Sequence, residues 1–600
     1  MRTSIATVCL SGTLTQKMEA CAAAGFDGIE VFEPDLVTAP QSPEEIRALA
    51  DRLGITLDLF QPFRDAEGVD PATFAGNVRR AEAKFRLMRR LGMDTMLVCS
   101  NVGTASVDDD HVSAAQLREL GDLAAGYGVR LAFEALAWGR YVDDYRRAWR
   151  VVELADHPAV GVCLDSFHIL SRGHDPKAIE QIPGDKVFFL QLADAPTLSM
   201  DVLSWSRHHR LFPGEGSFAL AEFLAHVLRT GYDGPLSLEV FNDTFRQTDP
   251  DRTARQALRS LRWLEDQAAR QLGGEAGPDL VRLPDVDEPA GLDFVEVKAE
   301  DAGEVEVLLR QLGFTFRGRH RSKPVRLWTQ GSARVVCNEQ QARDMPPTLS
   351  AIGYEVSSTA VSADRAARLL APQVHRRTYA GEQELAAFAA PDGTEIFLGE
   401  VPEGPDATWT VEFEQGASPD PDPLVTHVDH VNLVQPWQHY DEAVLFYSSV
   451  LGLEAQAALE VAGPVGLVTS QVMRSRDGRI RLALNLLPAG IEGGLPQHIA
   501  FACRDVVTLA REARARGLRT LAVPDNYYED LDARFDLAPD LLATLRELDL
   551  LYDRDGDAEF LHFYTATAGG VFLEVVERRG GYDGYGAANA PVRLAAQLSR

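Results

Sequence analysis

The chain has 600 residues, which is too long for one hydrophobic core and predicts two to four domains. Hydrophobic residues make up 45% and charged residues 25%, as is ordinary for globular proteins in water. The formal net charge is −30 and no long basic run is present. Nucleic acid and anionic membranes bind through clustered Lys and Arg, so we expect neither as a partner.

The apolar runs and the cysteines indicate the cellular compartment in which we expect the protein. No apolar run approaches the length of a membrane span, and the N-terminal text contains no convincing cleavage site. The six cysteines include no CxxC pair, and four lie in apolar, strand-like text: Cys9, Cys99, Cys163 and Cys503. We therefore expect buried free thiols rather than disulfides, and a cytoplasmic protein.

From residue 1 to about 270, short β-type runs alternate with amphipathic helical text. The predicted strands are TSIATV (3–8), GIEVF (28–32), TLDLFQ (56–61), TMLVCS (95–100), RLAFEAL (130–136), VGVCLDSF (160–167), KVFFLQLAD (186–194) and PLSLEVF (235–241). Several helical runs, such as SPEEIRALADRLG, end on a Gly, which is expected C-cap chemistry. Eight β-then-α units predict an α/β fold, a (β/α)8 TIM barrel. A doubly wound sheet is the alternative, but no GxGxxG turn follows the first strand.

Beyond residue 270, the composition and the pattern of the predicted elements change. Residues 271–289 are rich in Gly, Pro and acidic residues and are predicted to be a linker. Beyond them, strand-rich α+β text repeats one order: a strand, a helix ending in LGF or LGL, then several strands. The repeat predicts paired βαβββ modules, residues 290–413 and 425–590, that curl into one half-barrel. A Pro- and Asp-rich break at 414–424 separates them.

Four polar side chains lie at or near the ends of the last four predicted barrel strands: Glu134, Asp165, Gln191 and Glu239. A buried unpaired carboxylate is costly, so these groups need a partner. Active sites of such barrels lie at the C-terminal strand ends. Each residue alone could be a strand end capped by loop amides. All four together predict an oxygen-rich cage for a hard divalent cation.

Further polar groups fall near the same end of the predicted barrel. Glu30 ends the second strand and is a candidate base or a support for a ligand. His168 follows Asp165 by three residues, and we expect it to point into the barrel mouth. Arg64 and Arg210 are candidates for a bidentate clamp on a substrate carboxylate.

The motifs around these residues carry a family resemblance. GIEVFEPD, FEAL, CLDSFHIL, QLAD, FPGEGSF and LSLEVFND resemble the sugar-phosphate isomerase/epimerase-like barrels, which are related to xylose isomerase-type barrels. QPFRDAEG, SFHIL and RHHRLFPGEG, fused to the C-terminal half, resemble the bacterial two-domain 3-dehydroshikimate dehydratases. The resemblance implies dehydration of 3-dehydroshikimate to protocatechuate in quinate and aromatic catabolism. It also implies a divalent metal in the barrel, Mg²⁺, Mn²⁺ or Co²⁺.

For that substrate, the chemistry of the polar side chains suggests a role for each of them. A divalent cation would acidify the proton next to the ketone. His168 is the candidate for proton transfer, because imidazole titrates near working pH. Arg64 and Arg210 are candidates for the substrate carboxylate, and Ser206 for a substrate hydroxyl. Glu134 or Glu239 is the alternative base.

The second module carries a further set of candidate ligands. His430, His498 and Glu574 lie on three predicted strands, and two His with one carboxylate form the facial triad of non-haem Fe(II) oxygenases. With FYSSVLGLE, these motifs resemble 4-hydroxyphenylpyruvate dioxygenase of the vicinal oxygen chelate superfamily, over about residues 290–590. The resemblance implies a second divalent metal, Mg²⁺ or Fe²⁺, and a structural first module.

One departure from that family concerns the C-terminal tail. The tail reads GYGAANAPVRLAAQ and lacks the aromatic residue of the closing helix. An active dioxygenase, a metal site with another substrate, and a stabilising remnant therefore all stay open. For the whole chain, the alternatives are a sugar or hydroxypyruvate isomerase, a bifunctional dehydratase–dioxygenase, and a metal-binding sensor or scaffold. We expect a small-molecule substrate and a homo-oligomer.

Overall fold

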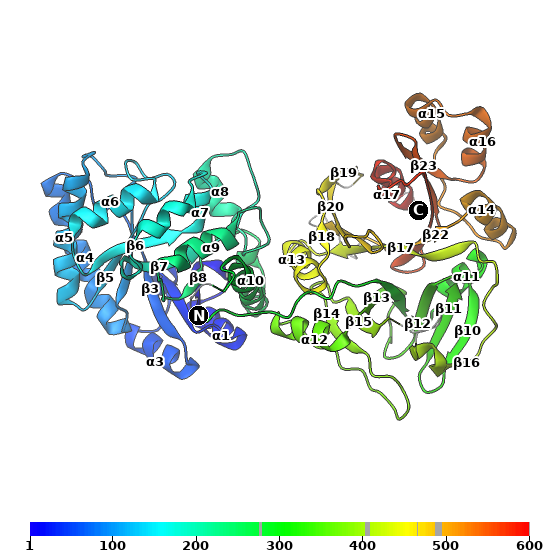
Figure 1. Ribbon diagram of the computed structural model, residues 1–600, viewed down its shortest axis with the longest axis horizontal. Helices are drawn as coiled ribbons and strands as arrows, with labels where there is room; N and C mark the ends of the chain where they lie inside the picture. Colours follow the sequence, from blue (N-terminus) through cyan, green and yellow to red (C-terminus); the bar gives the residue numbers. More distant parts are fainter. Residues whose placement is uncertain (275–278, 402–407, 465, 487–494, 599–600) are drawn as a thin grey trace. The chain divides into compact units, whose positions relative to one another are not determined.

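The computed structural model describes residues 1–274, 279–401, 408–464, 466–486 and 495–598. The chain divides into two compact units, Met1–Leu283 and Pro284–Arg600 (Figure 1). Residues 275–278 of the predicted linker lie outside the described residues, and its first residue, Gln271, ends a helix instead. Among the described residues, no helix has both the length and the apolar character needed to cross a membrane.

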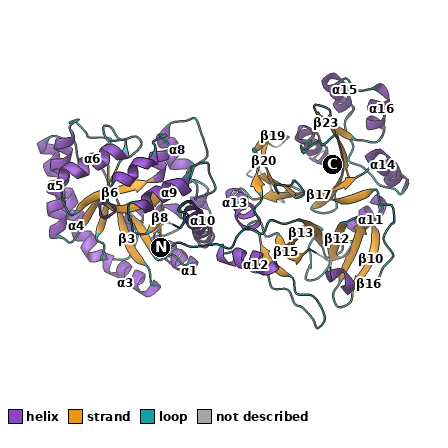
Figure 2. Ribbon diagram, in the orientation of Figure 1, coloured by secondary structure: helices purple, strands orange, loops and turns teal. Residues whose placement is uncertain are grey.

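The first unit is a closed barrel of eight parallel strands with helices around it, as Figure 2 shows by colour. Its strands are β1 (Thr3–Ala6), β2 (Gly28–Phe32), β3 (Thr56–Phe63), β4 (Thr95–Cys99), β5 (Arg130–Glu134), β6 (Val160–Asp165), β7 (Val187–Leu192) and β8 (Leu236–Leu238). Pairing of β1 with β8 closes the ring. The predicted TIM barrel is confirmed. The first and last strands are shorter than predicted, because β1 and β8 pair with each other only over three residues.

Helices follow the strands, and three of them end on the predicted glycine, at Gly25, Gly54 and Gly92. They are α1 (Leu14–Ala24), α2 (Glu33–Thr38), α3 (Pro43–Leu53), α4 (Pro71–Leu91), α5 (Asp110–Gly126), α6 (Tyr145–Ala155), α7 (Ser166–Leu170), α8 (Val202–His208), α9 (Leu220–Arg229) and α10 (Pro250–Gln271). Ser42 and Glu45 form a capping box at the start of α3. Gly54 ends α3 at φ 72°, a left-handed conformation that favours glycine.

The second unit contains two sheets. The first has the strand order β14-β15-β13-β9-β12-β11-β10-β16, and the second has the order β18-β20-β21-β17-β22-β25-β24-β23, with β19 paired to β20. Paired βαβββ units are confirmed, but the two predicted modules form two separate sheets rather than one half-barrel. Each sheet contains a pair of such repeats, because α11 and α12 both follow strands of the first sheet, as α13 and α14 do in the second. The repeat around α12 has two strands after its helix, since β16 pairs with β10.

The bounds of the elements in the first sheet are β9 (Gly291–Lys298), α11 (Gly303–Leu312), β10 (Thr315–His320), β11 (Val325–Gln330), β12 (Ala333–Asn338), β13 (Thr348–Val356), α12 (Thr359–Arg368), β14 (Ala386–Ala389), β15 (Glu395–Glu400) and β16 (Phe413–Gln415). Its core includes Phe294, Phe397 and Trp409. The equivalent elements of the second sheet are β17 (Val425–Gln435), α13 (Tyr440–Leu451), β18 (Glu454–Ala455), β19 (Leu459–Gly463), β20 (Gly466–Arg474), β21 (Arg481–Leu486), β22 (Gln497–Cys503), α14 (Val506–Ala515), α15 (Asp525–Phe535), α16 (Pro539–Glu547), β23 (Leu551–Asp555), β24 (Ala558–Tyr564), β25 (Val571–Arg579) and α17 (Ala590–Leu598).

All six cysteines are free thiols, and each is buried. The prediction of buried thiols in place of disulfides is therefore confirmed. Two of them contact the barrel site: Cys99 Sγ lies 3.4 Å from Glu134 Oε2, and Cys163 Sγ lies 3.4 Å from Gln191 Oε1. Burial raises the pKa of both thiols well above the ordinary value, so they act here as neutral donors.

A buried carboxyl in the loop after β3 makes stability depend on pH. Glu67 Oε1 accepts the backbone N–H of Asn101 at 2.9 Å, while Oε2 is buried without a hydrogen bond. Burial raises the pKa of Glu67 to about 7, from an ordinary value of 4.5. The folded state thus holds this proton more tightly than the unfolded state, and stability falls as pH rises through this window.

We expect Glu67→Gln to remove this loss. The free energy of unfolding of the variant, relative to that of wild type, should rise by about 2 kcal/mol between pH 5 and pH 8. Thermal melting at several pH values measures the difference. The exposed Glu119→Gln on α5 serves as control, and equal pH profiles for Glu67→Gln and wild type would contradict the assignment.

Candidate metal centres and active site

The C-terminal ends of four neighbouring barrel strands carry the predicted metal ligands. Glu134 ends β5, Asp165 ends β6, Gln191 lies on β7, and Glu239 follows β8. These strands are neighbours in the barrel, and Asp165 lies in register with Gln191. All four side chains are buried. Barrel closure thus brings the four predicted positions to one end of the barrel.

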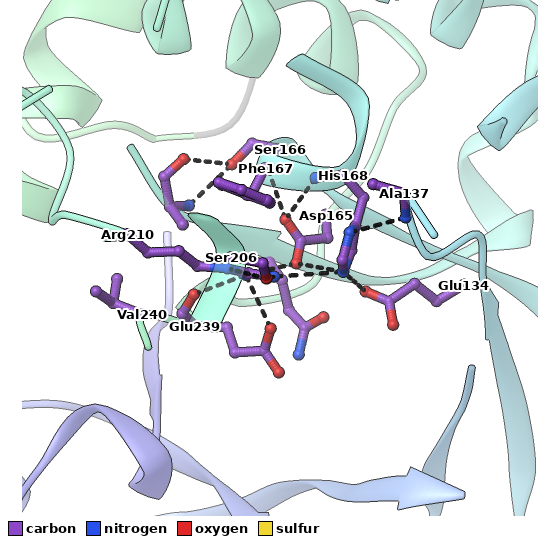
Figure 3. Close-up of polar contacts among 12 residues, drawn as sticks. Glu134, Ala137, Asp165, Ser166, Phe167, His168, Ser206, Arg210, Glu239 and Val240 are labelled. Atoms are coloured by element: carbon purple, nitrogen blue, oxygen red, sulfur yellow. Dashed lines mark hydrogen bonds and ion pairs between the residues drawn. The ribbon is translucent and has the colours of Figure 1, made fainter. Parts of the chain in front are cut away.

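A guanidinium lies between two of these carboxylates (Figure 3). Arg210 is 1% exposed, and its Nη1 donates to Asp165 Oδ2 at 2.8 Å and to Glu239 Oε2 at 3.0 Å. Its Nε and Nη2 donate to Ser206 Oγ at 3.1 and 2.9 Å. Arg210, predicted to bind a substrate carboxylate, is therefore paired with carboxylates of the protein in this structure. Ser206 holds it in place.

Negative charge in the barrel mouth exceeds the positive charge that pairs with it. Burial and the nearby carboxylates of Asp165 and Glu239 raise the pKa of Glu134 well above its usual range. Burial raises the pKa of Glu239 to about 7, despite the contact with Arg210. Burial opposes ionisation of Asp165 as well, but Arg210 outweighs it and holds the pKa of Asp165 low. A divalent cation would relieve the repulsion between these carboxylates.

His168 lies on α7, and the protein sets which of its nitrogens holds the proton. Its Nδ1 accepts the backbone N–H of Ala137 at 3.1 Å, so a neutral imidazole carries its proton on Nε2. Nε2 lies 3.3 Å from Arg210 Nη2, 3.7 Å from Glu134 Oε1 and 3.6 Å from Asp165 Oδ2. The guanidinium cannot accept a proton, so the acceptors near Nε2 are the two carboxylates. Burial lowers the pKa of His168 to about 3, so the ring is neutral at working pH.

Glu30 supports Gln191 rather than facing the cavity. Its Oε2 accepts from Gln191 Nε2 at 2.6 Å and from Gln61 Nε2 at 2.8 Å. Ser237 donates to the other carboxylate oxygen. Because Glu30 holds the Gln191 amide nitrogen, the carbonyl oxygen is the atom of Gln191 that can serve as a ligand, beside the hydrogen bond that it accepts from the Cys163 thiol. Of the two roles open to Glu30, the geometry favours support.

A cavity of about 640 Å³ opens in front of this cluster. Among its lining residues are Glu134, His168, Arg210 and Glu239. Arg64 also lines it, and its side chain has no hydrogen bond or ion pair with any residue that the structure describes. A cation without a partner at a polar cavity can receive a substrate anion. Arg64 is therefore better placed for that task than Arg210.

The second module brings its three predicted ligands together. His430 on β17, His498 on β22 and Glu574 on β25 offer ligand atoms within 4.8 Å of one another. Glu574 Oε2 lies 3.1 Å from His430 Nε2 and 3.0 Å from His498 Nε2. Burial works against protonation of the imidazoles, but Glu574 and Asp429 raise the pKa of His430 to about 9.

Three residues that the sequence did not single out orient these ligands. Asp429 Oδ1 lies 2.8 Å from His430 Nδ1, and Arg578 holds Asp429 with two contacts of 2.8 Å. His562 Nδ1 lies 2.7 Å from Glu574 Oε1. Such partners fix the orientation of metal ligands. Asp429, adjacent to His430 in HVDHVN, was the only one with a visible sequence signal.

A further group of possible ligands lies in the first module, although the resemblance implied none there. It consists of His320, Glu382 and Glu412. Glu412 lies 2.9 Å from His320 Nε2, and Lys323 Nζ lies 2.8 Å from Glu382. Because a lysine already neutralises one carboxylate and the imidazole pairs with the other, we regard this group as an ion-pair network.

The two candidate centres fit a metal by the same test, buried oxygens that lack a donor. Glu134 Oε1 is buried without a hydrogen bond. Glu574 Oε2 also lacks one of acceptable geometry, although two imidazole nitrogens lie close to it. An unsatisfied buried acceptor is costly, and a cation satisfies it. Carboxylate and amide oxygens suit Mg²⁺ or Mn²⁺, whereas the His–His–Glu set suits Fe²⁺.

The fold and these sites define a fusion of two known classes. Residues 18–267 match the xylose isomerase-like TIM barrel family, residues 287–414 match the N-terminal hydroxyphenylpyruvate dioxygenase family, and residues 427–556 match the glyoxalase/bleomycin resistance protein/dioxygenase superfamily. A solved structure described as a xylose isomerase-like TIM barrel/4-hydroxyphenylpyruvate dioxygenase fusion protein covers 100% of both chains. It is 40% identical, with a TM-score of 0.89.

Two relatives that match over the full length narrow the class of protein. The 3-dehydroshikimate dehydratase of Pseudomonas putida is 42% identical over 99% of this chain and 98% of its own length. That of Pseudomonas aeruginosa is 41% identical with the same coverage. The chain belongs to the 3-dehydroshikimate dehydratase family, in its two-domain, barrel-plus-dioxygenase-like form.

Proposed function

We propose that the barrel dehydrates 3-dehydroshikimate to protocatechuate, 3,4-dihydroxybenzoate. The cluster of Glu134, Asp165 and His168, at a cavity that Glu239 and an unpaired Arg64 also line, is the observation that carries this proposal. The names of the full-length relatives support the substrate. An isomerase of the same fold is not favoured, because nothing in the described cavity resembles a phosphate-binding loop.

The proposed ligands of the barrel metal are Glu134, Asp165, Gln191 and Glu239. When bound, a divalent cation such as Mg²⁺, Mn²⁺ or Co²⁺ supplies Lewis-acid polarisation of the substrate ketone. Asp165 and Glu239 pair with Arg210 in this structure, so a cation competes with that guanidinium for both carboxylates. Arg210 would thereby be released toward the cavity that it already lines.

The remaining residues bind the substrate and move protons. Arg64 and Arg210 hold the carboxylate, since both line the cavity. Ser206 accepts from Arg210, and its own hydroxyl proton is left to donate to a substrate hydroxyl. His168 holds a proton on Nε2 at the cavity wall. A neutral imidazole donor of this kind can serve an oxygen that gains charge or departs.

The second module is proposed to hold a second divalent metal, Fe²⁺ or Mg²⁺, on His430, His498 and Glu574. The first module is proposed to be structural. We assign the dehydratase to residues 1–270 because the free cation and the cavity lie there. A cytoplasmic location is supported by the six free cysteines, and a homo-oligomer stays a prediction.

One assay tests the assignment. Metal-loaded protein is incubated with 3-dehydroshikimate, and protocatechuate is followed by its absorbance. We expect product from wild type and from His498→Ala, and none above background from Glu134→Ala. No product from wild type would overturn the proposed reaction. Loss of activity in His498→Ala but not in Glu134→Ala would place the chemistry in the second module.

A further inference from the structure

The two sheets of the second unit pair their central strands in the same way. In the second sheet, β17 pairs antiparallel with β22, and β22 pairs parallel with β25. In the first sheet, β9 pairs antiparallel with β13, and β13 pairs parallel with β15. His430 lies in register with Ala500, and Ala500 with Glu574. Two of the three candidate metal ligands thus lie in one row across three strands, and the first module has an equivalent set of strands.

A buried aspartate shows which row of the first module corresponds to this one. Asp429 directly precedes His430, is buried and pairs with an arginine. Asp293 directly precedes Phe294 and has the same two properties. The row that begins at Phe294 therefore corresponds to the row that begins at His430.

Aromatic rings occupy the row of the first module. Phe294 on β9 lies in register with Gly353 on β13, and Gly353 lies in register with Phe397 on β15. The two ring centres are 5.8 Å apart. A Cβ atom at Gly353 would lie 2.4 Å from Phe294 Cδ1, so glycine leaves room for this ring. The first module thus offers two phenylalanine rings where the second offers an imidazole and a carboxylate.

These rings line a cavity of about 160 Å³. Trp409 also lines it, and the Trp409 ring centre lies 5.1 Å from that of Phe294 in an edge-to-face arrangement. Ala387 belongs to the same buried cluster and completes this wall. A cavity of roughly 150 Å³ with apolar walls holds one benzene molecule. Size and lining therefore match a single aromatic ring, which gains edge-to-face contacts with the rings of the wall.

The strong cations in the lining of this cavity already have acidic partners. Arg376 donates to Glu296 at 2.9 and 3.0 Å, and its guanidinium lies 4.3 Å from the ring centre of Phe397. Lys323 and His320 have the acidic partners described above. The remaining ionisable residues of the lining are exposed: His375 and Glu384. An anionic ligand would gain no new partner from the paired lysine and arginine, and it would approach the buried carboxylates.

We propose that the first module binds a small uncharged aromatic molecule, such as a phenol, with its ring against Phe294, Phe397 and Trp409. The paired charges disfavour a ring that carries a carboxylate. The proposal goes beyond the dehydratase function and does not depend on it, because every residue that carries it lies in the second unit. It adds a ligand site to the module to which we otherwise assign a structural role.

Fluorine NMR of 4-fluorophenol, titrated with the full-length protein, tests this site. Ala387→Leu fills part of the cavity and should weaken binding at one site by at least about tenfold, because the ring loses buried contact area. Ala590→Leu is the matched control, since Ala590 lines the cavity of the second module, and it should bind 4-fluorophenol at this site as wild type does. The anion 4-fluorobenzoate should show no difference between wild type and Ala387→Leu.

Three results would overturn the proposal. One is equal binding of 4-fluorophenol to wild type and Ala387→Leu, with both proteins folded by circular dichroism. Another is an Ala590→Leu variant that loses as much binding as Ala387→Leu, and the third is 4-fluorobenzoate that distinguishes wild type from Ala387→Leu as strongly as 4-fluorophenol does. Ala387→Val makes the same comparison with a smaller side chain if Ala387→Leu does not fold. The dehydratase assay on the same preparations separates this result from the barrel function, because an inactive barrel leaves the expected titration unchanged.

Discussion

Chelation of divalent cations abolishes dehydration of 3-dehydroshikimate, and added Mg²⁺, Mn²⁺ or Co²⁺ restores it: this is the expected result with the largest effect. Glu134→Gln and Glu239→Gln should each lower kcat/KM by at least about 10³-fold, since a Lewis acid is worth several kcal/mol. Chelation has this effect because Glu134 and Glu239 are buried carboxyl groups with raised pKa values, which take up protons once no cation holds them ionised.

Metal analysis accompanies the kinetics. Glu134→Gln should lose the barrel metal and keep the second one, whereas His498→Ala should show the reverse. Glu153→Gln, an exposed acid on α6, is the matched control and should behave as wild type. A chelated protein that retains full turnover would refute a metal role in the barrel.

Replacement of His168 gives the second large effect. His168→Gln removes the proton that Nε2 presents to the cavity, and kcat should fall by about 10² to 10⁴-fold, the usual range for a proton-transfer residue. The barrel metal should stay bound, and KM should change little, because Arg64 and Arg210 remain. Steady-state kinetics and metal content measure the two quantities together.

Ligand atoms of His168, Glu134 and Asp165 lie within 4.8 Å of one another, so His168 could also be a metal ligand. Activity alone does not distinguish a metal ligand from a proton-transfer residue, but the metal content of the variant does. Loss of the barrel metal in His168→Gln would make this residue a ligand and refute the proton-transfer role. His111→Gln on α5 is the control, because His111 is exposed and far along the chain from the strand ends.

The three-dimensional arrangement explains why some site residues were visible in the sequence and others were not. Glu134, Asp165, Gln191 and Glu239 stood out because each interrupts or ends an apolar strand run, a local signal. His430, His498 and Glu574 stood out in the same way. Arg64 and Ser206 could be named only as polar loop residues near the strand ends.

Contacts between distant parts of the chain left no such signal. Arg210 inserts between Asp165 and Glu239, and Glu30 reaches Gln191 across 161 positions of sequence. His562 supports Glu574 and in turn contacts Asn589 at 3.0 Å. Each pair forms only because sheet closure or strand register brings the two partners together.

The sequence by itself determined the barrel, the βαβββ repeats and the strand-end acids, because strand and helix periodicities, glycine caps and polar residues in apolar runs are local properties. The tertiary structure alone decided which charges meet. It paired Arg210 with two expected metal ligands, left Arg64 at the cavity without a hydrogen bond or ion pair among the described residues, and set a backbone N–H against Nδ1 of His168. Electrostatic partnership depends on distance and burial in space, and neither quantity can be read from the order of residues.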